Sequence, residues 1–253
     1  MDSSASPKRS CCAVLELRQY TLKPGQRDAL IDLFDEHFVE SQEALGMTVV
    51  GQFRDRHRSD RFVWVRGFSD MKSRHAALEQ FYGGPVWAAH KAAANETMLD
   101  SDDVLLLKPA RPDLTFQVDP VDRPAAGEDR TATLVLAGIH PLPQPADAAF
   151  VARFERQVQP LLRASGVALD GIFVTESAPN TFTRLPVREG EQVLVWFGTL
   201  ERRGADGGRE SGSGPGWLEQ LAVGVSSLSE QPAVLLQLDP TRRSLLGHRR
   251  KRP

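Results

Sequence analysis

Acidic, basic and aromatic side chains alternate with leucines in the first predicted strand. Glu16, Arg18 and Tyr20 fall on one face of this strand, and Leu15 and Leu17 fall on the other, because successive side chains point to opposite faces. A strand with one apolar and one charged face indicates a polar cavity. We therefore expect the leucines to pack against helices and the charged face to line that cavity.

Two further predicted strands, over residues 48–54 and 61–67, show the same alternation. The residues that we expect to face helices are Val49, Phe53, Val63 and Val65. Those that we expect to line the cavity with Glu16 and Arg18 are Gln52, Arg54, Phe62, Trp64 and Arg66. Arginine forks bind carboxylates and phenolates well, so these residues predict a site for a small organic acid with an apolar, partly aromatic body.

Tyr20 and His140 are the candidates for proton transfer in this site. Histidine titrates near neutral pH, and a tyrosine hydroxyl can donate to an oxyanion. Leu134 and Leu136 should form an apolar wall opposite the charged one. An alternative stays open, in which Glu16 simply pairs with arginine and fixes the fold without any ligand.

Other residues that could bind metal or react are isolated along the chain. His75 and His90 could each ligate a metal or haem, but neither belongs to a set of several ligands, so no metal or cofactor is predicted. No phosphate-binding loop or nucleophile motif is present. Cys11 and Cys12 are adjacent, which is poor geometry for a bridge, and we expect two reduced thiols.

The elements that would position these residues follow a β-α-β-β-α-β order, which is the ferredoxin-like pattern. The predicted elements of the first copy are a strand over 13–21, a helix over 26–42, strands over 48–54 and 61–67, helices over 71–82 and 85–98, and a strand over 104–108. The second copy is predicted as a strand over 133–140, a helix over 147–165, strands over 169–176 and 192–200, a short helix after Pro215, and a strand over 233–238. A Gly- and Ser-rich segment over 203–214 replaces one helix and is predicted to be a mobile loop.

The two copies indicate an internal duplication. Three pairs of residues occupy matching positions, namely Leu22 with Leu142, Gly67 with Gly198, and Trp87 with Trp217. The predicted segments are a disordered N-terminus (1–12), a first repeat (13–109), a linker (110–131), a degenerate second repeat (132–240) and a basic tail (241–253). Two such sheets can pack face to face, so the predicted fold is α+β, with two ferredoxin-like repeats forming a dimeric α/β barrel within one chain.

Composition narrows the range of partners. The chain has 253 residues and a net charge of −2, so no global field attracts nucleic acid, and no apolar run reaches the length of a membrane span. Residues 1–10 do not have the pattern of a signal peptide. We expect a cytoplasmic protein, a monomer or a homodimer, whose partner is a small-molecule ligand rather than nucleic acid.

Two motifs resemble the NIPSNAP family: Glu16-Leu17-Arg18-Gln19-Tyr20-Thr21-Leu22-Lys23-Pro24-Gly25, and Phe62-Val63-Trp64-Val65-Arg66-Gly67-Phe68 followed by Gly84-Pro85-Val86-Trp87. The resemblance is specific over residues 13–109 and weaker over 132–240. It implies the dimeric α/β-barrel superfamily, which includes cofactor-free monooxygenases, haem-handling proteins, isomerases and dehalogenases. Two hypotheses follow: a cofactor-independent oxygenase or isomerase acting on an organic acid, or a non-catalytic scaffold whose barrel is filled by its own side chains.

Overall fold

A computed structural model describes residues 11–125, 128, 133–200, 216–226 and 231–248. The first repeat contains β1 (Val14–Leu22), α1 (Arg27–Leu33), the π-helical turn η1 (Phe34–Phe38), α2 (Val39–Glu43), β2 (Thr48–Asp55), β3 (Arg61–Phe68), α3 (Met71–Gly83), α4 (Pro85–Thr97), β4 (Met98–Asp100) and β5 (Val104–Pro109). A 3-10 turn, η2 (Pro120–Asp122), lies between the repeats. The second repeat contains β6 (Val135–Leu142), α5 (Ala148–Gln157), α6 (Gln159–Ala164), β7 (Val167–Thr175), β8 (Gln192–Leu200), α7 (Trp217–Ser226) and β9 (Val234–Pro240).

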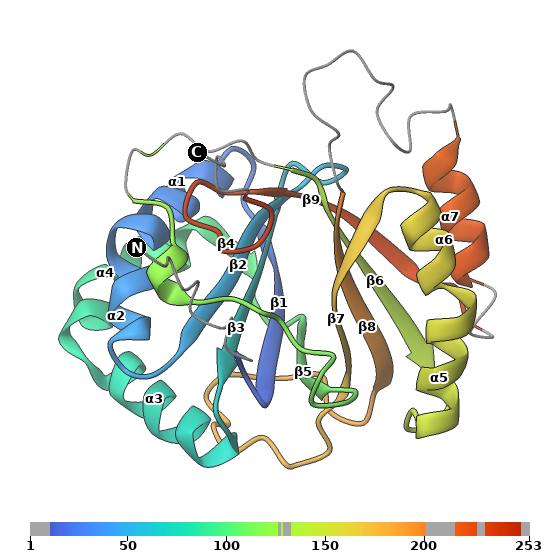
Figure 1. The fold of residues 1–253 in the computed structure, drawn as a ribbon. Helices are drawn as coiled ribbons and strands as arrows, with labels where there is room; N and C mark the ends of the chain where they lie inside the picture. Colours follow the sequence, from blue (N-terminus) through green and yellow to red (C-terminus); the bar gives the residue numbers. More distant parts are fainter. Residues whose placement is uncertain (1–10, 126–127, 129–132, 201–215, 227–230, 249–253) are drawn as a thin grey trace, which may run out of the picture.

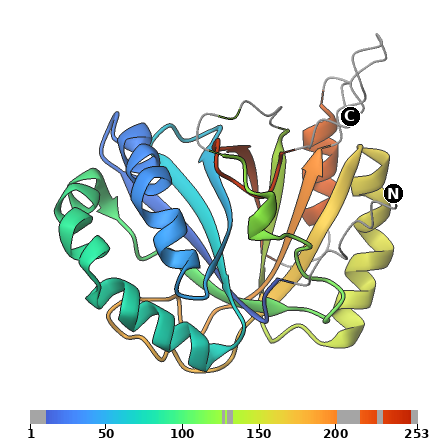
Figure 2. The same cartoon turned by 60° about the vertical axis from the view of Figure 1, so that its left-hand side comes forward.

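Eight antiparallel strands close into a barrel in the order β3-β2-β9-β6-β8-β7-β5-β1, because β1 also pairs with β3. The two repeats join at two seams, where β2 pairs with β9 and β5 pairs with β7. The short strand β4 extends the sheet beside β1. Figure 1 shows α1–α4 outside one side of the barrel and α5–α7 outside the other, and the turned view in Figure 2 agrees. The predicted α+β barrel of two ferredoxin-like repeats is therefore confirmed.

The barrel interior is apolar and draws on both repeats. Leu15, Leu17, Val63 and Val65 belong to this interior cluster, together with Phe173, Val195 and Phe197 from the second repeat. The prediction that Leu15, Leu17, Phe53, Val63 and Val65 face the helices is therefore wrong. The physical reason is that the two sheets meet inside the barrel and exclude water there, so their more apolar faces point inward.

The opposite face of the first sheet packs against its helices. Tyr20, Phe62 and Trp64 lie there with residues of α1, η1 and α3, including Phe34 and Phe81. Val49 lies on this helix side as predicted, because a bulge between Val49 and Gly51 shifts the register of β2. The residues that we expected to line the barrel thus lie under the helices instead. Leu134 and Leu136, expected as a wall of the barrel, likewise lie on the helix side of the second sheet.

A shared bulge relates the two repeats. Gly51 leaves room for the ring of Phe53, since an added Cβ would lie 2.3 Å from it, and Gly171 does the same for Phe173 at 2.6 Å. Each pair sits beside a register shift in its strand. The same glycine, phenylalanine and β-bulge in both repeats support the predicted duplication.

The register changes one predicted match between the repeats. With Leu22 aligned on Leu142, Glu16 corresponds to Leu136; Glu16 pairs with Arg66, whereas Leu136 pairs with Gly198. Gly198 is therefore the counterpart of Arg66 rather than of Gly67, and Trp196 is the counterpart of Trp64. The predicted loop over 203–214 lies outside the described residues, as does the side chain of Trp217, so the predicted match of Trp87 with Trp217 stays a prediction.

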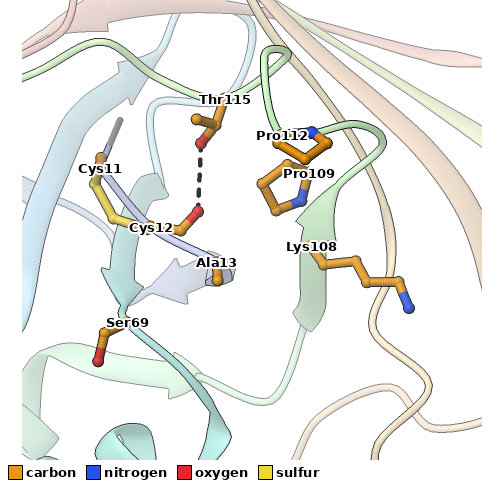
Figure 3. Close-up of a pocket in the computed structure, with 8 residues that line it drawn as sticks. All are labelled: Cys11, Cys12, Ala13, Ser69, Lys108, Pro109, Pro112 and Thr115. Carbon is orange, nitrogen blue, oxygen red and sulfur yellow. Dashed lines mark hydrogen bonds between the residues drawn. A yellow bond between two sulfur atoms is a disulfide. The ribbon is translucent and has the colours of Figure 1, made fainter. Parts of the chain in front are cut away.

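Segments that we expected to be linkers and tails contribute to the barrel. Phe116, from the predicted linker, and Leu246, from the predicted tail, both join the interior cluster. Cys12 is buried there too, and its Sγ is joined to that of Cys11 in a disulfide, contrary to the expected thiols. These cysteines line a cavity of about 510 Å³ together with Pro109, Pro112 and Lys108 (Figure 3).

Candidate functional site

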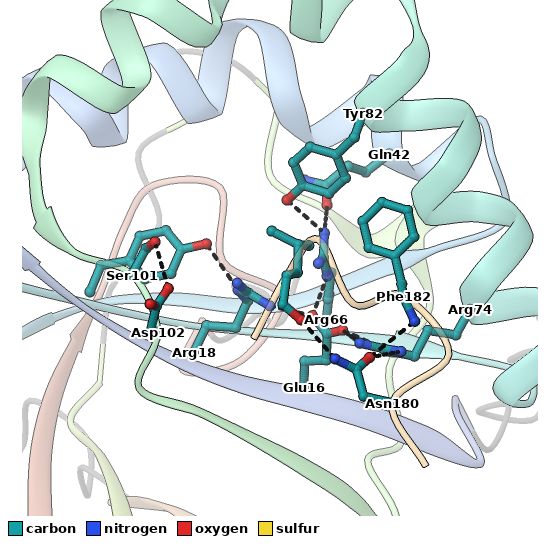
Figure 4. A network of polar contacts seen from close by, with 12 residues as sticks. Glu16, Arg18, Gln42, Arg66, Arg74, Tyr82, Ser101, Asp102, Asn180 and Phe182 are labelled. Carbon is teal, nitrogen blue, oxygen red and sulfur yellow. Dashed lines mark hydrogen bonds and ion pairs between the residues drawn. The ribbon is translucent and has the colours of Figure 1, made fainter. Parts of the chain in front are cut away.

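One buried carboxylate holds three arginines on the helix side of the first sheet (Figure 4). Glu16 Oε2 accepts hydrogen bonds from Arg18 Nη1 at 2.8 Å and from Arg66 Nε at 2.7 Å. Glu16 Oε1 accepts one from Arg74 Nε at 2.7 Å. All four side chains are at most 1% exposed. We call these four residues the arginine cluster.

Three elements bring the cluster together. Glu16 on β1 lies directly opposite Arg66 on β3, so their side chains share a face. Arg74 comes from α3, where Asp70 caps the helix by accepting a hydrogen bond from the Ser73 backbone N–H at 2.6 Å. Gln42 on α2 adds a hydrogen bond from Arg66 Nη1 to its Oε1 at 3.0 Å.

The arginine cluster carries an excess of positive charge. Burial alone would raise the pKa of Glu16, but the charges of Arg66, Arg18 and Arg74 outweigh it and hold that pKa far below its usual range. Glu16 is therefore ionised and offsets one of three guanidinium charges. Among the described residues no second carboxylate is bonded to these three arginines. Two buried positive charges are left over, and such charges are costly without an anionic partner.

Aromatic rings surround these charges. The Trp64 ring centroid lies 5.0 Å from the guanidinium carbon of Arg66 and 5.6 Å from that of Arg18, which is cation–π distance. Tyr82 also lies close to Arg66, with its Oη 3.5 Å from Nη1. Three buried donors around the cluster, Arg66 Nη2, Trp64 Nε1 and Arg74 Nη2, make no hydrogen bond within the described part of the chain, although Arg74 Nη2 lies 2.7 Å from Glu16 Oε1.

Tyr20 closes one end of the arginine cluster. Its hydroxyl accepts a hydrogen bond from Arg18 Nε at 2.9 Å. Burial raises the pKa of the Tyr20 hydroxyl, and the nearby Arg18 opposes that rise only in part. Tyr20 is therefore a neutral phenol at physiological pH. The bond from Arg18 draws electron density from its oxygen and makes the O–H group a better donor.

Gln52 and Arg54 do not join the cluster. Gln52 pairs with Trp64 across the strands and is fully buried, but its side-chain amide makes no hydrogen bond to the three arginines. Arg54 points outward and binds Asp28 on α1, with Nε 2.8 Å from Oδ1. The structure thus brings together Glu16, Arg18, Tyr20, Trp64 and Arg66 from the predicted site and leaves Arg54 outside it.

His140 and Tyr20 belong to different repeats. His140 is on β6 and lies on the helix side of the second sheet, where its ring contacts Phe154 of α5. Its Nε2 accepts a hydrogen bond from Trp196 Nε1 at 3.1 Å, and burial lowers its pKa to about 4. The indole of Trp196 fills the space over Gly138, where an added Cβ would lie 2.1 Å from Nε1. Gly138 is the counterpart of Arg18, so a tryptophan occupies the place that the arginine has in the first repeat.

Five polar or aromatic residues of this region were missed by the sequence analysis: Gln42, Arg74, Tyr82, Asn180 and Phe182. Arg74 left a usable signal, because it shares the buried stripe of α3 with Ala77, Leu78 and Phe81. An arginine on an apolar helical stripe needs a buried partner. Asn180 and Phe182 left no such signal, since they come from a loop of the other repeat.

The histidines considered as metal or haem ligands have other contacts. His90 stacks on His37 with ring centroids 3.7 Å apart, and His75 Nδ1 lies 2.7 Å from the carbonyl oxygen of Thr181. Within the described ranges, no group of three or more His, Cys, Asp or Glu residues could hold a metal ion. In the same ranges, no helix is both long and apolar enough to cross a membrane.

The fold and its buried cluster define a dimeric α/β-barrel protein made from one chain. The NIPSNAP family model matches residues 15–112, a range that includes Glu16, Arg18, Arg66 and Arg74 of the arginine cluster, so this part of the chain is similar to the NIPSNAP family.

Solved structures with both halves of the barrel agree on the fold. A "putative monooxygenase" from Lactobacillus acidophilus is 12% identical with a TM-score of 0.50, over 93% of this chain and 97% of its own. A second, from Fusobacterium nucleatum, is 10% identical with a TM-score of 0.53, over 93% and 95%. A NIPSNAP family protein from Agrobacterium tumefaciens is 21% identical with a TM-score of 0.37, over 42% of this chain and 95% of its own. No curated protein sequence matches the chain.

Proposed function

We propose that the arginine cluster binds a small, partly aromatic organic acid. The observation that carries this proposal is the excess of two buried positive charges around Glu16. A carboxylate ligand would supply the missing negative charge and accept from the unpartnered Arg66 Nη2. The indole of Trp64 and the ring of Tyr82 would face the apolar body of the ligand.

Catalysis as a cofactor-independent oxygenase or isomerase is the further part of this proposal. Tyr20 is the group that we assign to it, since a neutral phenol activated by Arg18 can donate a proton to a developing oxyanion. The two barrel neighbours named as monooxygenases share this fold, which supports the reaction class by analogy only. His140 is assigned no part, because it lies under the helices of the other repeat.

A scaffold without a ligand is the alternative, and one observation favours it. The arginines are bonded to Glu16, Gln42, Tyr20 and Asn180 and face several aromatic rings. These contacts stabilise part of the excess charge, and cation–π contacts contribute about 0.5–2 kcal/mol each. In this alternative the cluster only fixes the helices to the sheet.

Ligand-induced stabilisation separates the two functions. We expect benzoate to raise the melting temperature of the wild-type protein by several degrees, since saturating ligand adds about 2.7 kcal/mol at one hundred times Kd. Benzamide, which has the same shape without the charge, should give no shift. Arg18→Gln should abolish the benzoate shift, because it removes one guanidinium of the cluster. The measurement is a thermal melt at fixed ionic strength.

Arg54→Gln is the matched control for this experiment, because Arg54 lies outside the cluster and pairs with Asp28. It should keep the benzoate shift of the wild type. A folded wild-type protein whose melting temperature responds to neither benzoate nor other aromatic carboxylates would support the scaffold instead.

A further inference from the structure

The β7–β8 loop, residues 176–191, belongs to the second repeat but lies against the site of the first. The corresponding connection between β2 and β3 spans only residues 56–60. Apart from β4, each strand of the first repeat has a counterpart in the second, and the connection between β7 and β8 is much longer than that between β2 and β3. Its course toward α3 is visible in Figure 4, where Asn180 and Phe182 approach the arginine cluster.

Asn180 joins the loop to the arginine cluster. Its Oδ1 accepts hydrogen bonds from Arg74 Nη1 at 3.0 Å and from the backbone N–H of Phe182 at 3.1 Å. Its Nδ2 donates to the carbonyl oxygen of Leu185 at 2.9 Å. One side chain therefore fixes the loop conformation and occupies a donor of the cluster.

Phe182 forms an aromatic wall beside the cluster. Its side chain is 3% exposed, and its ring stacks on Tyr82 with centroids 5.8 Å apart. Leu185 and Val187 follow it into the same apolar cluster under the helices. The loop is held at its far end by Arg188, whose backbone N–H donates to the carbonyl oxygen of Val104 at 2.8 Å.

We infer that the second repeat determines which acids the first repeat binds, through Asn180 and Phe182 of the β7–β8 loop. This inference rests on the proposed function. Phe182 and Tyr82 would contact the apolar body of the ligand, and Asn180 would set how much of Arg74 the carboxylate can reach. The four residues of the cluster are at most 1% exposed, so a ligand reaches them only when some of the covering side chains move. Phe182 would thus affect selectivity by direct contact with the ligand, and Asn180 is a positioning residue that acts through Arg74.

Calorimetric titration of the full chain with benzoate and with acetate tests the inference. Phe182→Ala should raise the Kd for benzoate about tenfold and change the Kd for acetate less than about twofold, because acetate has no ring to contact. Asn180→Asp should raise both Kd values about tenfold or more, since the new carboxylate would compete with the ligand for Arg74. Phe182→Leu keeps an apolar side chain at this position and should lie between the wild type and Phe182→Ala.

Thr183→Ala is the matched control, because Thr183 is exposed on the same loop. It should bind both acids like the wild type. If the wild type binds benzoate, and Asn180→Asp and Phe182→Leu bind benzoate and acetate with the same Kd values as the wild type, the loop inference fails and the proposed function stands. If the folded wild type binds neither acid, the proposed function fails, and the inference fails with it.

Discussion

Replacing Glu16 with glutamine is expected to destabilise the protein by about 3–5 kcal/mol, which is the effect of removing one partner from a buried ion pair. Glu16 is fully buried and is the carboxylate that holds Arg18, Arg66 and Arg74 together. Glutamine keeps the shape but leaves three guanidinium charges without an anion. Urea denaturation followed by circular dichroism measures the loss.

Asp28→Asn is the matched control, since Asp28 is also a carboxylate bound to arginine but is 70% exposed. Exposed ion pairs contribute about 0–1 kcal/mol, so this variant should differ little from the wild type. Added acetate should restore part of the stability of Glu16→Gln if the cluster accepts external anions. A loss below about 1 kcal/mol for Glu16→Gln would show that the aromatic rings alone compensate the arginines.

The stability of the protein is expected to depend on His140 between about pH 4 and pH 6.5, because burial lowers the pKa of this side chain from 6.5 to about 4. In this range the unfolded chain binds a proton that the folded one does not. The contribution of His140 is therefore fully present above pH 6.5 and is lost as the pH falls toward 4. A shift of this size corresponds to about 3 kcal/mol.

The test compares the wild type with His140→Gln across this range by denaturant unfolding. Asp35 titrates in the same window with the opposite sign, because burial raises the pKa of its carboxyl to about 6. Subtracting the free energy of unfolding of His140→Gln from that of the wild type removes the contribution of Asp35. This difference should change by about 3 kcal/mol from pH 6.5 to pH 4. His57→Gln replaces an exposed histidine and is the control, for which the difference in unfolding free energy from the wild type should not change in this way. Parallel curves for the wild type and His140→Gln would contradict the prediction.

The sequence predicted the elements well because their patterns are local. The strand over 192–200 was predicted with the observed bounds, and the strand over 13–21 is shifted by one residue. The predicted helix over 26–42 is broken by the π turn η1, which keeps both Phe34 and Phe38 buried. No spacing rule signals such an extra residue, so it could not be predicted.

The faces of the strands could be predicted only in part. Alternation correctly placed Glu16, Arg18 and Tyr20 together, because that depends on the geometry of one strand. It did not show which face meets the helices, since both faces of this sheet are buried. The choice depends on how two sheets pack, and the apolar face took the barrel interior.

The sequence predicted the part of the candidate site that lies on the strands β1 and β3. Glu16 and Arg18 share one face of β1, and Arg66 lies opposite Glu16 on β3, so this part of the cluster follows from the register of the two strands. Arg74 could have been found from its place on the helical stripe. Asn180 and Phe182 depend on a contact between residues more than a hundred positions apart, which one sequence without relatives does not reveal.

The closure of the barrel within one polypeptide has a consequence for how its halves can change. In a barrel made from two identical subunits, every substitution appears twice, so each position must serve both halves at once. Here the hydrogen-bonded seams β2–β9 and β5–β7 join two unequal repeats of one polypeptide. Glycine therefore stands at position 138 of one half, where the other half has Arg18, while both halves keep the tryptophan on the paired strand. Fusion turns a symmetric assembly into one whose halves can specialise independently.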